Sequence, residues 1–436
     1  MKLGIVNLGC PKNTVDTECM LSCLDSFSIT TSAADADVIL INTCAFLKDA
    51  RTESRKAVSD MIRQKKKNAK VIVAGCFVTK DLSGLQKEFP GVHAWLGVND
   101  LMSVGEAIRN GGVYVSGKPF IYKSAQHTVM LNPYSAYVKI SDGCNHRCSF
   151  CAIPAIKGKY RSRSMEDIAS EIKGMVDSGI KEINLISQDL TYYGRDNYGR
   201  PMLDALLRAI LKKTKKYFWL RLLYLYPDKK VISGIKKVME ADPRLYRYID
   251  IPFQHVSDRV LSSMKRGYKK ADIMETLKLL RTVQGGITIR SSFIAGYPGE
   301  TERDFTELLD FVSAGHVDKA GVFGYSDEPG TSAHKLKGKH NKKTVDSRKK
   351  RLMLASSQVY HYNNERQAGM KKTVLVTGIK GKNTYFARTQ ENAPDIDGYI
   401  TVSSRKRLVP GGFYTASVTG TKNFELQGEI IAAGKH

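Results

Sequence analysis

The sequence predicts an α/β protein with three parts: an N-terminal doubly wound α/β domain, a central partial (β/α)6 barrel and a C-terminal small β-barrel. Three observations carry this prediction. Apolar strands alternate with amphipathic helices before residue 105, the same rhythm returns over 136–330, and short strands between glycine-rich turns follow residue 368. We place the domains at 1–130, 131–367 and 368–436.

The front domain rests on three apolar runs, "KLGIVNL", "DVILIN" and "KVIVAG". Such continuous runs are typical of buried parallel strands, and the segments between them have helical period. Residues 106–135 predict only a polar connection to the next domain.

The central domain repeats the strand and helix pattern six times, which favours an open barrel over the full eight units. The strands are "AYVKIS", "EINLIS", "FWLRLLY", "YIDI", "ITIRSSFI" and "DKAGVFGYS". Helices are expected near 165–178, 203–213, 229–240, 257–265, 271–284 and 301–314, with a basic helix at 341–368.

The last segment has a different sequence pattern, without the alternating helices of the two domains before it. It contains five short predicted strands, "KTVLVTG", "TYFARTQ", "GYITVS", "FYTASVTG" and "FELQGEIIA". This pattern predicts a small β-barrel. Barrels of this size commonly bind nucleic acid or protein, and a purely stabilising role is the alternative.

Composition favours a globular cytoplasmic protein. In 436 residues, 42% are hydrophobic and no apolar run approaches the roughly 18 residues of a membrane span. The first residues lack the apolar core of a signal peptide. In a reducing cytosol, clustered cysteines indicate metal or redox chemistry rather than structural disulfides.

The net charge of +25 is unevenly distributed along the sequence. The segment from Lys335 to Arg351 contains nine basic residues and a single acidic one, Asp346. Such a run is either a solvated helix surface or a footprint for a polyanion. A client that is RNA, or lies beside RNA, is the sharper interpretation.

Three of the eight cysteines, Cys144, Cys148 and Cys151, lie within "SDGCNHRCSFCAIP" after the first barrel strand. Zinc prefers four ligands, and His146 between the cysteines is too close in sequence for easy tetrahedral closure. A [4Fe–4S] cluster held by three thiolates leaves one iron open to bind substrate. We therefore favour a catalytic cluster over a zinc knuckle.

A second set, Cys10, Cys44 and Cys76, is dispersed in sequence, but each member follows a predicted strand of the front domain. The carboxyl ends of parallel strands lie along one edge, so we expect these cysteines to converge. Free cysteines are also common core residues, which is the alternative for any one of them. Cys19 and Cys23 are expected to pack on a helix.

The spacing C-x3-C-x2-C with Phe150 before the last cysteine resembles the radical S-adenosylmethionine (SAM) enzymes. "FIAGYPGET", which contains Gly296, is similar to a segment near the cofactor of that superfamily. The resemblance implies SAM bound at an open iron. It also implies one-electron cleavage of SAM, which yields a radical able to abstract hydrogen from carbon.

Taken together, the two cysteine sets and three domains resemble the radical SAM methylthiotransferases over essentially the whole chain, with a TRAM-like final domain. Some members modify tRNA and others modify the β-carbon of an aspartate in ribosomal protein number twelve of the small subunit. The second branch is favoured by "LGCPKNTVDTE", "CSFCAIP", "SQDLTYYGRDNYG", "RLLYLYP", "DIPFQHVS" and "APDIDG". Lys157 and Asp395 depart from the usual arginine and glutamate but keep the charge.

This resemblance implies two [4Fe–4S] clusters and two uses of SAM. One SAM methylates a sulfur at the Cys10, Cys44 and Cys76 cluster, and the other gives the radical at the second cluster. The six cysteines are thus predicted as metal ligands and catalytic residues. Predicted cofactor contacts are Phe150, Ser187, Gln188, Arg221, Gln254 and Gly296. Further lining candidates are Asp189, Tyr192, Tyr193, Tyr198, Tyr224, His255 and Ser326.

Expected partners are the small-subunit ribosomal protein, free or in the subunit, an electron donor such as flavodoxin or ferredoxin, and a sulfur source. We expect a monomer with no membrane association. One alternative is a tRNA adenosine methylthiotransferase. Another is a non-catalytic RNA-binding protein that carries zinc or a cluster.

Overall fold

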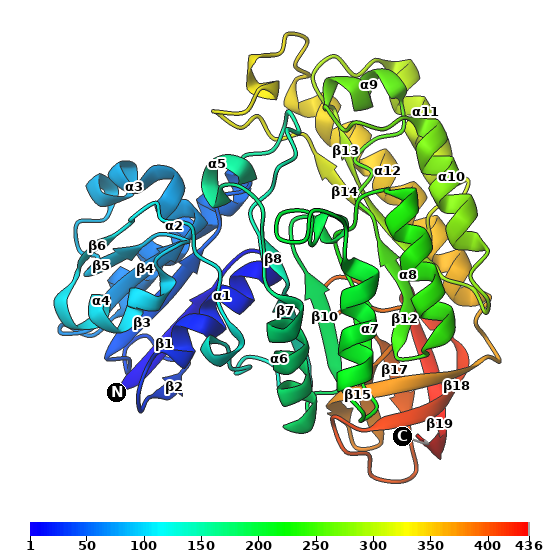
Figure 1. Cartoon of the computed structure of the whole chain (residues 1–436), viewed down its shortest axis with the longest axis horizontal. Helices are drawn as coiled ribbons and strands as arrows, with labels where there is room; N and C mark the ends of the chain where they lie inside the picture. Colours follow the sequence, from blue (N-terminus) through cyan, green and yellow to red (C-terminus); the bar gives the residue numbers. More distant parts are fainter. Residues whose placement is uncertain (435–436) are drawn as a thin grey trace.

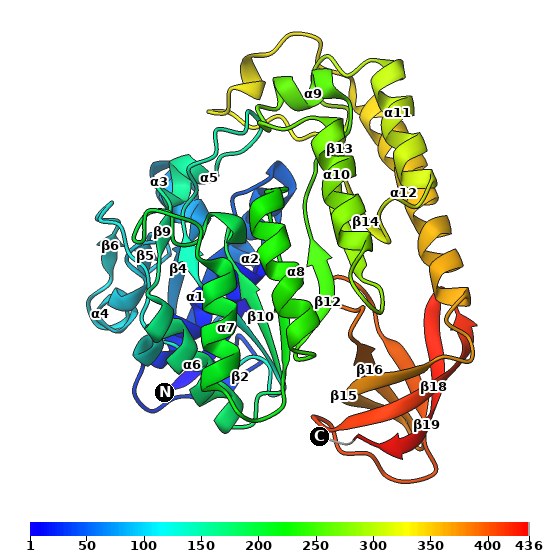
Figure 2. The same ribbon diagram turned by 45° about the vertical axis from the view of Figure 1, so that its right-hand side comes forward.

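The computed structural model describes residues 1–434 and contains two six-stranded parallel sheets and one closed five-stranded barrel (Figure 1). The front sheet and the C-terminal barrel lie on different sides of the central domain (Figures 1 and 2). This arrangement confirms the predicted fold class. Among the described residues, no helix is long and apolar enough to cross a membrane.

The front sheet has the order β2-β1-β3-β4-β5-β6, so the chain reverses direction across the sheet between β1 and β3. Helices α1 and α4 cover one face, where Met20 and Val104 join its core, and α2 and α3 cover the other, where Val58 and Phe77 are buried. The strands are β1 (Lys2–Asn7), β2 (Ser28–Thr30), β3 (Val38–Thr43), β4 (Lys70–Gly75), β5 (Ala94–Leu96) and β6 (Gly112–Tyr114). The helices are α1 (Pro11–Ser22), α2 (Lys48–Gln64), α3 (Cys76–Glu88), η1 (Leu101–Ser103) and α4 (Val104–Asn110).

The polar connection predicted for 106–135 is partly wrong. Its first residues complete α4 and form β6, which pairs in parallel with β5. The irregular part therefore begins only after Tyr114 and contains η2 (Ser124–Gln126).

The central sheet has the order β14-β13-β12-β11-β10-β7, and all neighbours are parallel. Its outer face packs on the flanking helices through residues such as Leu185 and Leu207. The strands are β7 (Ser135–Lys139), β10 (Glu182–Ile186), β11 (Trp219–Leu222), β12 (Leu245–Asp250), β13 (Thr288–Ala295) and β14 (Lys319–Gly324). The helices are α6 (Met165–Asp177), α7 (Leu203–Lys213), α8 (Lys229–Ala241), α9 (Asp258–Ser263), α10 (Lys270–Arg281) and α11 (Glu302–Ser313). The six predicted units are confirmed.

Shorter elements lie at the mouth of the open barrel, around the second cysteine set. A two-stranded sheet is formed by β8 (Ser141–Asp142) and β9 (Arg161–Ser162), with α5 (Ile153–Lys157) between them. The single-turn helices η3 (Leu190–Tyr192) and η4 (Ala333–Lys335) follow strands β10 and β14.

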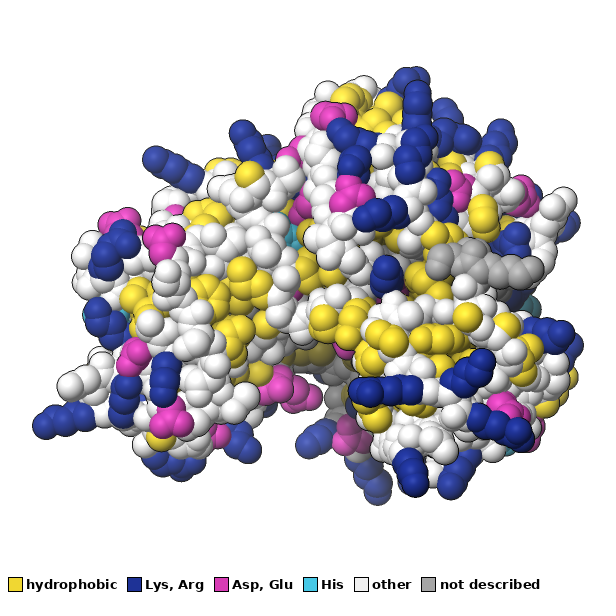
Figure 3. Space-filling model, turned by 90° about the horizontal axis from the view of Figure 1, so that it is seen from below, with side chains coloured by type: hydrophobic (Ala, Val, Ile, Leu, Met, Phe, Trp, Pro, Cys, Tyr) yellow, Lys and Arg dark blue, Asp and Glu magenta, His cyan; other side chains and the backbone are white. Residues whose placement is uncertain are grey.

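The basic segment forms α12 (Lys342–Glu365), which packs along the central sheet and leads into the C-terminal barrel (Figure 2). That barrel closes in the order β15-β16-β17-β19-β18. Its strands are β15 (Lys371–Gly381), β16 (Thr384–Thr389), β17 (Ile400–Ser403), β18 (Phe413–Lys422) and β19 (Glu425–Ala433), as predicted. From below, Lys and Arg side chains project around the outline of the molecule (Figure 3).

A loop of the C-terminal barrel, residues 390–397, covers part of the inner face of the central sheet. Tyr137 donates to Asp395 Oδ2 at 2.8 Å and Tyr248 donates to Asp397 Oδ2 at 2.5 Å. Asp397 also pairs with Arg290 on β13. Polar side chains on this part of the inner face thus bind the C-terminal domain rather than solvent.

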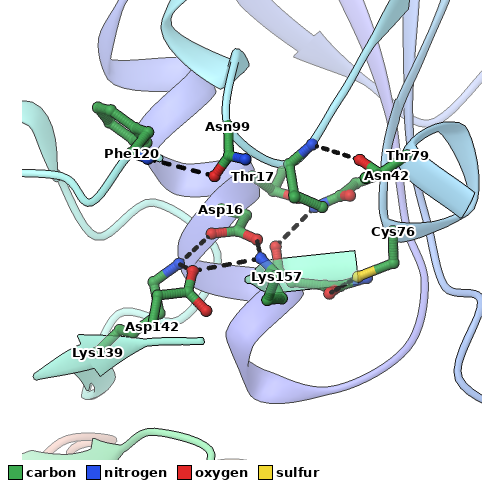
Figure 4. A network of polar contacts seen from close by, with 12 residues as sticks. Asp16, Thr17, Asn42, Cys76, Thr79, Asn99, Phe120, Lys139, Asp142 and Lys157 are labelled. Carbon is green, nitrogen blue, oxygen red and sulfur yellow. Dashed lines mark hydrogen bonds and ion pairs between the residues drawn. The ribbon is translucent and has the colours of Figure 1, made fainter. Parts of the chain in front are cut away.

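The front domain docks on the central domain through a buried network of two carboxylates and two ammonium groups (Figure 4). Asp16 on α1 lies 2.5 Å from Lys139 Nζ and 2.9 Å from Lys157 Nζ. Asp142 pairs with the same two lysines at 2.9 and 3.4 Å. Burial alone would lower the pKa of Lys157, but the two carboxylates outweigh it and hold its pKa well above the usual value. The same contacts raise the pKa of Lys139 and lower that of Asp142, so these two groups and Lys157 are charged.

Two further charged contacts join these domains. Glu328, which follows β14 and is 1% exposed, pairs with Arg51 of α2 and Lys80 of α3. The His127 ring lies between Glu18 of α1 and Glu171 of α6, at 3.1 and 2.6 Å.

We expect Asp16→Ala to destabilise the docked front domain strongly, because the change leaves two buried lysines with one carboxylate. Removing one partner of a buried pair costs about 3–5 kcal/mol. Thermal unfolding and limited proteolysis of the 115–134 connection measure the loss. Asp25→Ala, at an exposed position on the same domain, is the control. Equal unfolding midpoints for the two variants would contradict the docking role.

The stability that His127 contributes should fall as pH rises. Burial opposes its protonation, but Glu171 and Glu18 outweigh burial and raise its pKa. This contribution is complete below the unfolded value of about 6.5 and is lost as pH rises through the higher folded pKa. Between pH 6 and 9, the difference in melting temperature between wild type and His127→Gln should shrink. His93→Gln serves as the control, and a constant difference would refute the assignment.

Candidate functional site

The first cysteine set lies at the carboxyl ends of three adjacent strands of the front sheet. Cys10 follows β1 and precedes α1, Cys44 follows β3 directly, and Cys76 begins α3 directly after β4. Strands β1, β3 and β4 are neighbours in parallel register. This edge is the reversal point of the strand order, where open α/β sheets bind ligands.

A glycine before Cys10 allows the turn to approach Cys44 closely. Gly9 has a φ of +94°, and a Cβ atom there would lie 2.7 Å from Cys44 Cβ. Only a residue without a side chain fits this conformation and this gap. The first and second loops of the set are therefore packed directly against one another.

Buried amides brace the same edge. Asn13 Nδ2 donates to the carbonyls of Leu8 and Thr43, at 2.8 and 3.2 Å, and so ties the end of β1 to the end of β3. The Cys76 thiol lies 4.0 Å from Asn13 Oδ1. Asn42 donates in turn to the Asn13 carbonyl at 2.9 Å. This network fixes the positions of the three loops.

The second set lies on the loop between β8 and α5. The backbone N–H of Cys144 donates to the Gly158 carbonyl at 3.1 Å, and Cys151 closes a tight turn onto Cys148. Gly143 has a φ of +78°, and a Cβ there would lie 2.1 Å from the Lys159 carbonyl oxygen. The loop is therefore folded back on the strand that follows it.

Arg266 supplies positive charge to the second set. Its Nη1 donates to Cys148 Sγ at 3.2 Å, and its other nitrogens bind Tyr268 and the Pro252 carbonyl. His146, considered above as a fourth ligand, is held elsewhere. Its Nε2 lies 2.7 Å from Asp189 Oδ2, and its ring stacks on Tyr226 at 4.3 Å.

The loop of the second set is packed against the domain that carries the first. Ala152 and Ile156, just beyond Cys151, belong to the same buried cluster as Cys76 and Phe77. Lys157 acts electrostatically on Cys76 and lowers its pKa, against the larger effect of burial. The loop of the second set therefore packs against the start of helix α3, which Cys76 begins.

The segment that directly follows β11 carries two tyrosines whose pKa values are raised in part by cysteines of the two sets. Burial raises the pKa of Tyr224, and the neighbouring Cys10 raises it further. Two residues on, burial raises the pKa of Tyr226, to which Cys148 also contributes. One short segment thus carries, for each set, a tyrosine that interacts electrostatically with one of its cysteines.

The chemistry of the thiols suits cluster ligation. Burial raises the pKa of Cys76 and Cys151 to about 12 and that of Cys144 to about 11, with neighbouring cysteines adding to the shift. A bound cluster would supply the positive charge that these thiolates need. No group of three His, Cys, Asp or Glu side chains in residues 1–434 is gathered around a single-ion site. A cubane distributes its ligands over separate irons and needs wider spacing than tetrahedral zinc.

Several predicted lining residues lie near this junction. Gln188 donates to Asp142 Oδ1 at 3.2 Å, and its buried Oε1 has no partner among the described residues. Ser187 is fully buried beside it. Gln254 has a φ of +73° and bridges to β13, and Phe150 packs against Met264 and Tyr297.

Two predicted cofactor contacts have other partners in the structure. Arg221 binds Glu182 and donates to the carbonyls of Gln390 and Asn392, so its guanidinium anchors the C-terminal loop. At Gly296 a Cβ would lie 2.7 Å from Val345 of α12, so this glycine admits the helix. Neither residue is carried into the proposed cofactor site.

The remaining candidates for lining the site have other contacts in the structure, either at the domain junction or within the central domain. Ser326 donates to Glu328 at the domain junction, and His255 accepts from the Ser257 backbone. Tyr193 is fully buried and donates to the Arg163 carbonyl, whereas Tyr198 is exposed. Cys19 and Cys23 pack in helix α1, as predicted.

Sequence reasoning missed the charged residues that organise the site, namely Lys12, Asp16, Lys139, Asp142 and Arg266. Lys12 and Asp16 lie in the quoted motif "LGCPKNTVDTE", which was the available signal. Arg266 carries no local signal, because its partner Cys148 is 118 residues away.

Comparison with known families divides the chain into three matches. Residues 138–312 match the Radical SAM superfamily, residues 2–97 match an uncharacterized family designated UPF0004, and residues 368–431 match the TRAM domain. These matches follow the two sheets and the C-terminal barrel.

Curated relatives match over nearly the full length. A protein of Pelotomaculum thermopropionicum named ribosomal protein uS12 methylthiotransferase RimO is 39% identical, with 99% of each chain covered. A RimO of Elusimicrobium minutum is 37% identical, with 99% of this chain and 100% of the relative covered.

Solved structures share the architecture at low identity. The radical SAM methyltransferase TsrM from Kitasatospora setae, with tryptophan and a SAM analogue, has a TM-score of 0.52 and 15% identity over 74% of this chain and 72% of that one. The cobalamin-dependent radical enzyme OxsB has a TM-score of 0.51 and 13% identity over 82% and 56%. These likenesses support the fold alone.

We expect Gly9→Ala to disturb the first cysteine set more than a matched substitution elsewhere. Gly112→Ala is the control, since Gly112 has a φ of +99° but no atom within 4 Å of a new Cβ. The two variants share the backbone strain, so their difference reports the collision with Cys44, on the order of 1–3 kcal/mol. Calorimetry and alkylation of Cys44 measure it. Equal stability and equal Cys44 reactivity would disprove the close packing.

Proposed function

Because the chain belongs to the RimO family of ribosomal protein uS12 methylthiotransferases, we propose that it installs a methylthio group on the β-carbon of an aspartate of uS12. It is a transferase of the radical SAM superfamily, which uses SAM and a [4Fe–4S] cluster. The full-length likeness to RimO proteins is the observation that carries the choice of substrate.

We assign the radical SAM cluster to Cys144, Cys148 and Cys151. When bound, this cluster supplies the one-electron cleavage of SAM. The chain itself provides three thiols on a loop fixed by backbone hydrogen bonds, and Arg266 Nη1 donates to Cys148 Sγ at 3.2 Å. The side chain of His146 is withheld by Asp189, which supports a three-cysteine site.

We infer that Cys10, Cys44 and Cys76 hold a second [4Fe–4S] cluster, which carries the sulfur to be methylated. Three adjacent strand ends, closed by Gly9 and braced by Asn13, support this inference. All six cysteines are then metal ligands and catalytic residues. The packing of Ala152 and Ile156 beside Cys76 supports transfer within one cavity.

Around that cavity, the chain excludes water and orients the reactants. Tyr224 and Tyr226 cover the junction, and Phe150, Ser187, Gln188 and Gln254 remain the proposed SAM contacts. The unpartnered Gln188 Oε1 supports this role, since a buried acceptor is costly until a ligand satisfies it.

As a radical SAM enzyme, the protein needs a reductant, and we propose flavodoxin or ferredoxin as the donor. We further propose that it works in the cytoplasm, as a monomer, on the free protein or the assembling subunit. Exposed basic residues of α12, among them Lys342, Lys343, Lys350 and Arg351, support a client that lies beside RNA.

Reconstituted enzyme with SAM and reductant should add a methylthio group to uS12 and leave tRNA unmodified. Mass spectrometry of the protein and of tRNA nucleosides, in separate reactions, measures both. A methylthio increment on tRNA alone would overturn the proposed substrate.

Two triple cysteine-to-alanine variants separate the roles of the clusters. Each should bind about half of the iron held by wild type and form no methylthio product. The variant of Cys144, Cys148 and Cys151 should also lose 5′-deoxyadenosine formation. Cofactor cleavage by that variant would reverse the assignment.

A further inference from the structure

Within residues 1–434, one cation at the domain junction has no anionic partner. Lys12 lies in the first turn of α1, two residues after Cys10. Its Nζ lies 3.2 Å from the centroid of the Tyr224 ring. Among the described residues, it forms no hydrogen bond and no ion pair. This isolation contrasts with Lys139 and Lys157 of the same junction, each of which pairs with two carboxylates.

The carboxylates that act electrostatically on Lys12 are engaged elsewhere. Asp250 binds Arg290 at 3.0 Å and the Tyr224 backbone at 3.1 Å. Asp142 is shared by Lys139, Lys157 and the Gly143 backbone. The fold therefore supplies acids near Lys12 but gives none of them to it.

An ammonium group at a largely covered junction is unfavourable without a counter-charge, and an aromatic face compensates only in part. The ring of Tyr224 nevertheless fixes the position of the lysine. Such a group is ready to bind an anion that arrives with a ligand.

Lys12 is also placed where both cysteine sets meet. On one side, Lys12 is two residues from Cys10 of the first set. On the other, it contacts Tyr224, which lies two residues before Tyr226. The Tyr226 ring stacks on His146, which lies in the loop of the second set. An anion on Lys12 would therefore be held between them. In an aspartate side chain the carboxylate carbon is bonded directly to the β-carbon, so holding the carboxylate fixes the carbon that must react.

We propose that Lys12 binds the carboxylate of the target aspartate and selects an acidic side chain as the substrate. This inference rests on the proposed function. Lys12 acts as a specificity-determining residue, with Tyr224 as the surface that positions it. The competing explanation is that Lys12 only balances the charge of the Cys10 ligand.

The test compares Lys12→Met and Lys12→Arg in the full-length, reconstituted enzyme. Methionine keeps the length and removes the charge, and arginine restores it. Binding is titrated with uS12 and with uS12 in which the target aspartate is replaced by asparagine. Lys87→Met, at an exposed position late in α3, controls for loss of one positive charge in the front domain.

We expect Lys12→Met to weaken binding of aspartate-bearing uS12 about tenfold or more, the scale of a charged hydrogen bond. Binding of the asparagine form should change less than about twofold on the same scale. Lys12→Arg should recover most of the affinity, and Lys87→Met should match wild type. The wild-type enzyme should bind the aspartate form more tightly than the asparagine form.

Equal losses for the two substrates in Lys12→Met would overturn the proposal. A loss of bound iron in Lys12→Met that is restored in Lys12→Arg would also overturn it. In that case the positive charge of residue 12 would serve the Cys10 ligand rather than the substrate. If wild-type enzyme modifies uS12 but does not distinguish the two forms, only this inference fails. If wild-type enzyme does not modify uS12 at all, the proposed function fails with it.

Discussion

The pairing of Asp16 with Lys139 and Lys157 is the interaction on which the rest of the structure depends. It joins the helix that follows Cys10 to the strand and helix that flank Cys144 and Cys151. A buried ion pair repays its desolvation only when its geometry is good, so it penalises sliding of one domain over the other. An apolar interface of similar size would tolerate such shifts far better. The proposed transfer between two cysteine sets on separate domains needs this restriction.

Most of the fold could be predicted because its signals are local. Strand ends, glycine-rich turns and helical period are all read within a few residues. The three-residue strands β2, β5 and β6 were missed, since such segments are too short to show a period. The covered inner face of the central sheet was not predicted either. The loop at 390–397 that covers this face lies far away in sequence, and nothing in its residues indicates where it packs.

The candidate site was predictable only in part, for a related reason. Cysteine spacing and strand-end position identified all six proposed ligands, and the placement of Cys10, Cys44 and Cys76 follows directly from parallel pairing. Polar residues of the barrel were harder to assign. Arg221 lies within β11 and binds the C-terminal loop, whereas Tyr224 lies beyond the strand and faces Lys12. Sequence order alone does not separate residues at the mouth from residues deeper along the same inner face.

Two polar groups that lack a partner among residues 1–434 lie at the place that the charged contacts enclose. Buried charges in folded proteins are normally paired, because an isolated one costs several kcal/mol. Here Asp16, Glu328 and His127 are paired around the junction, whereas Lys12 and the Gln188 carbonyl oxygen have no ion-pair or hydrogen-bond partner in the described part of the chain. Removal of the surrounding pairs would free the domains to move and let the inner groups find partners or water. The rigid outer contacts therefore keep the inner groups available, and an enclosure of this kind favours ligands that bring their own negative charge and hydrogen-bond donors.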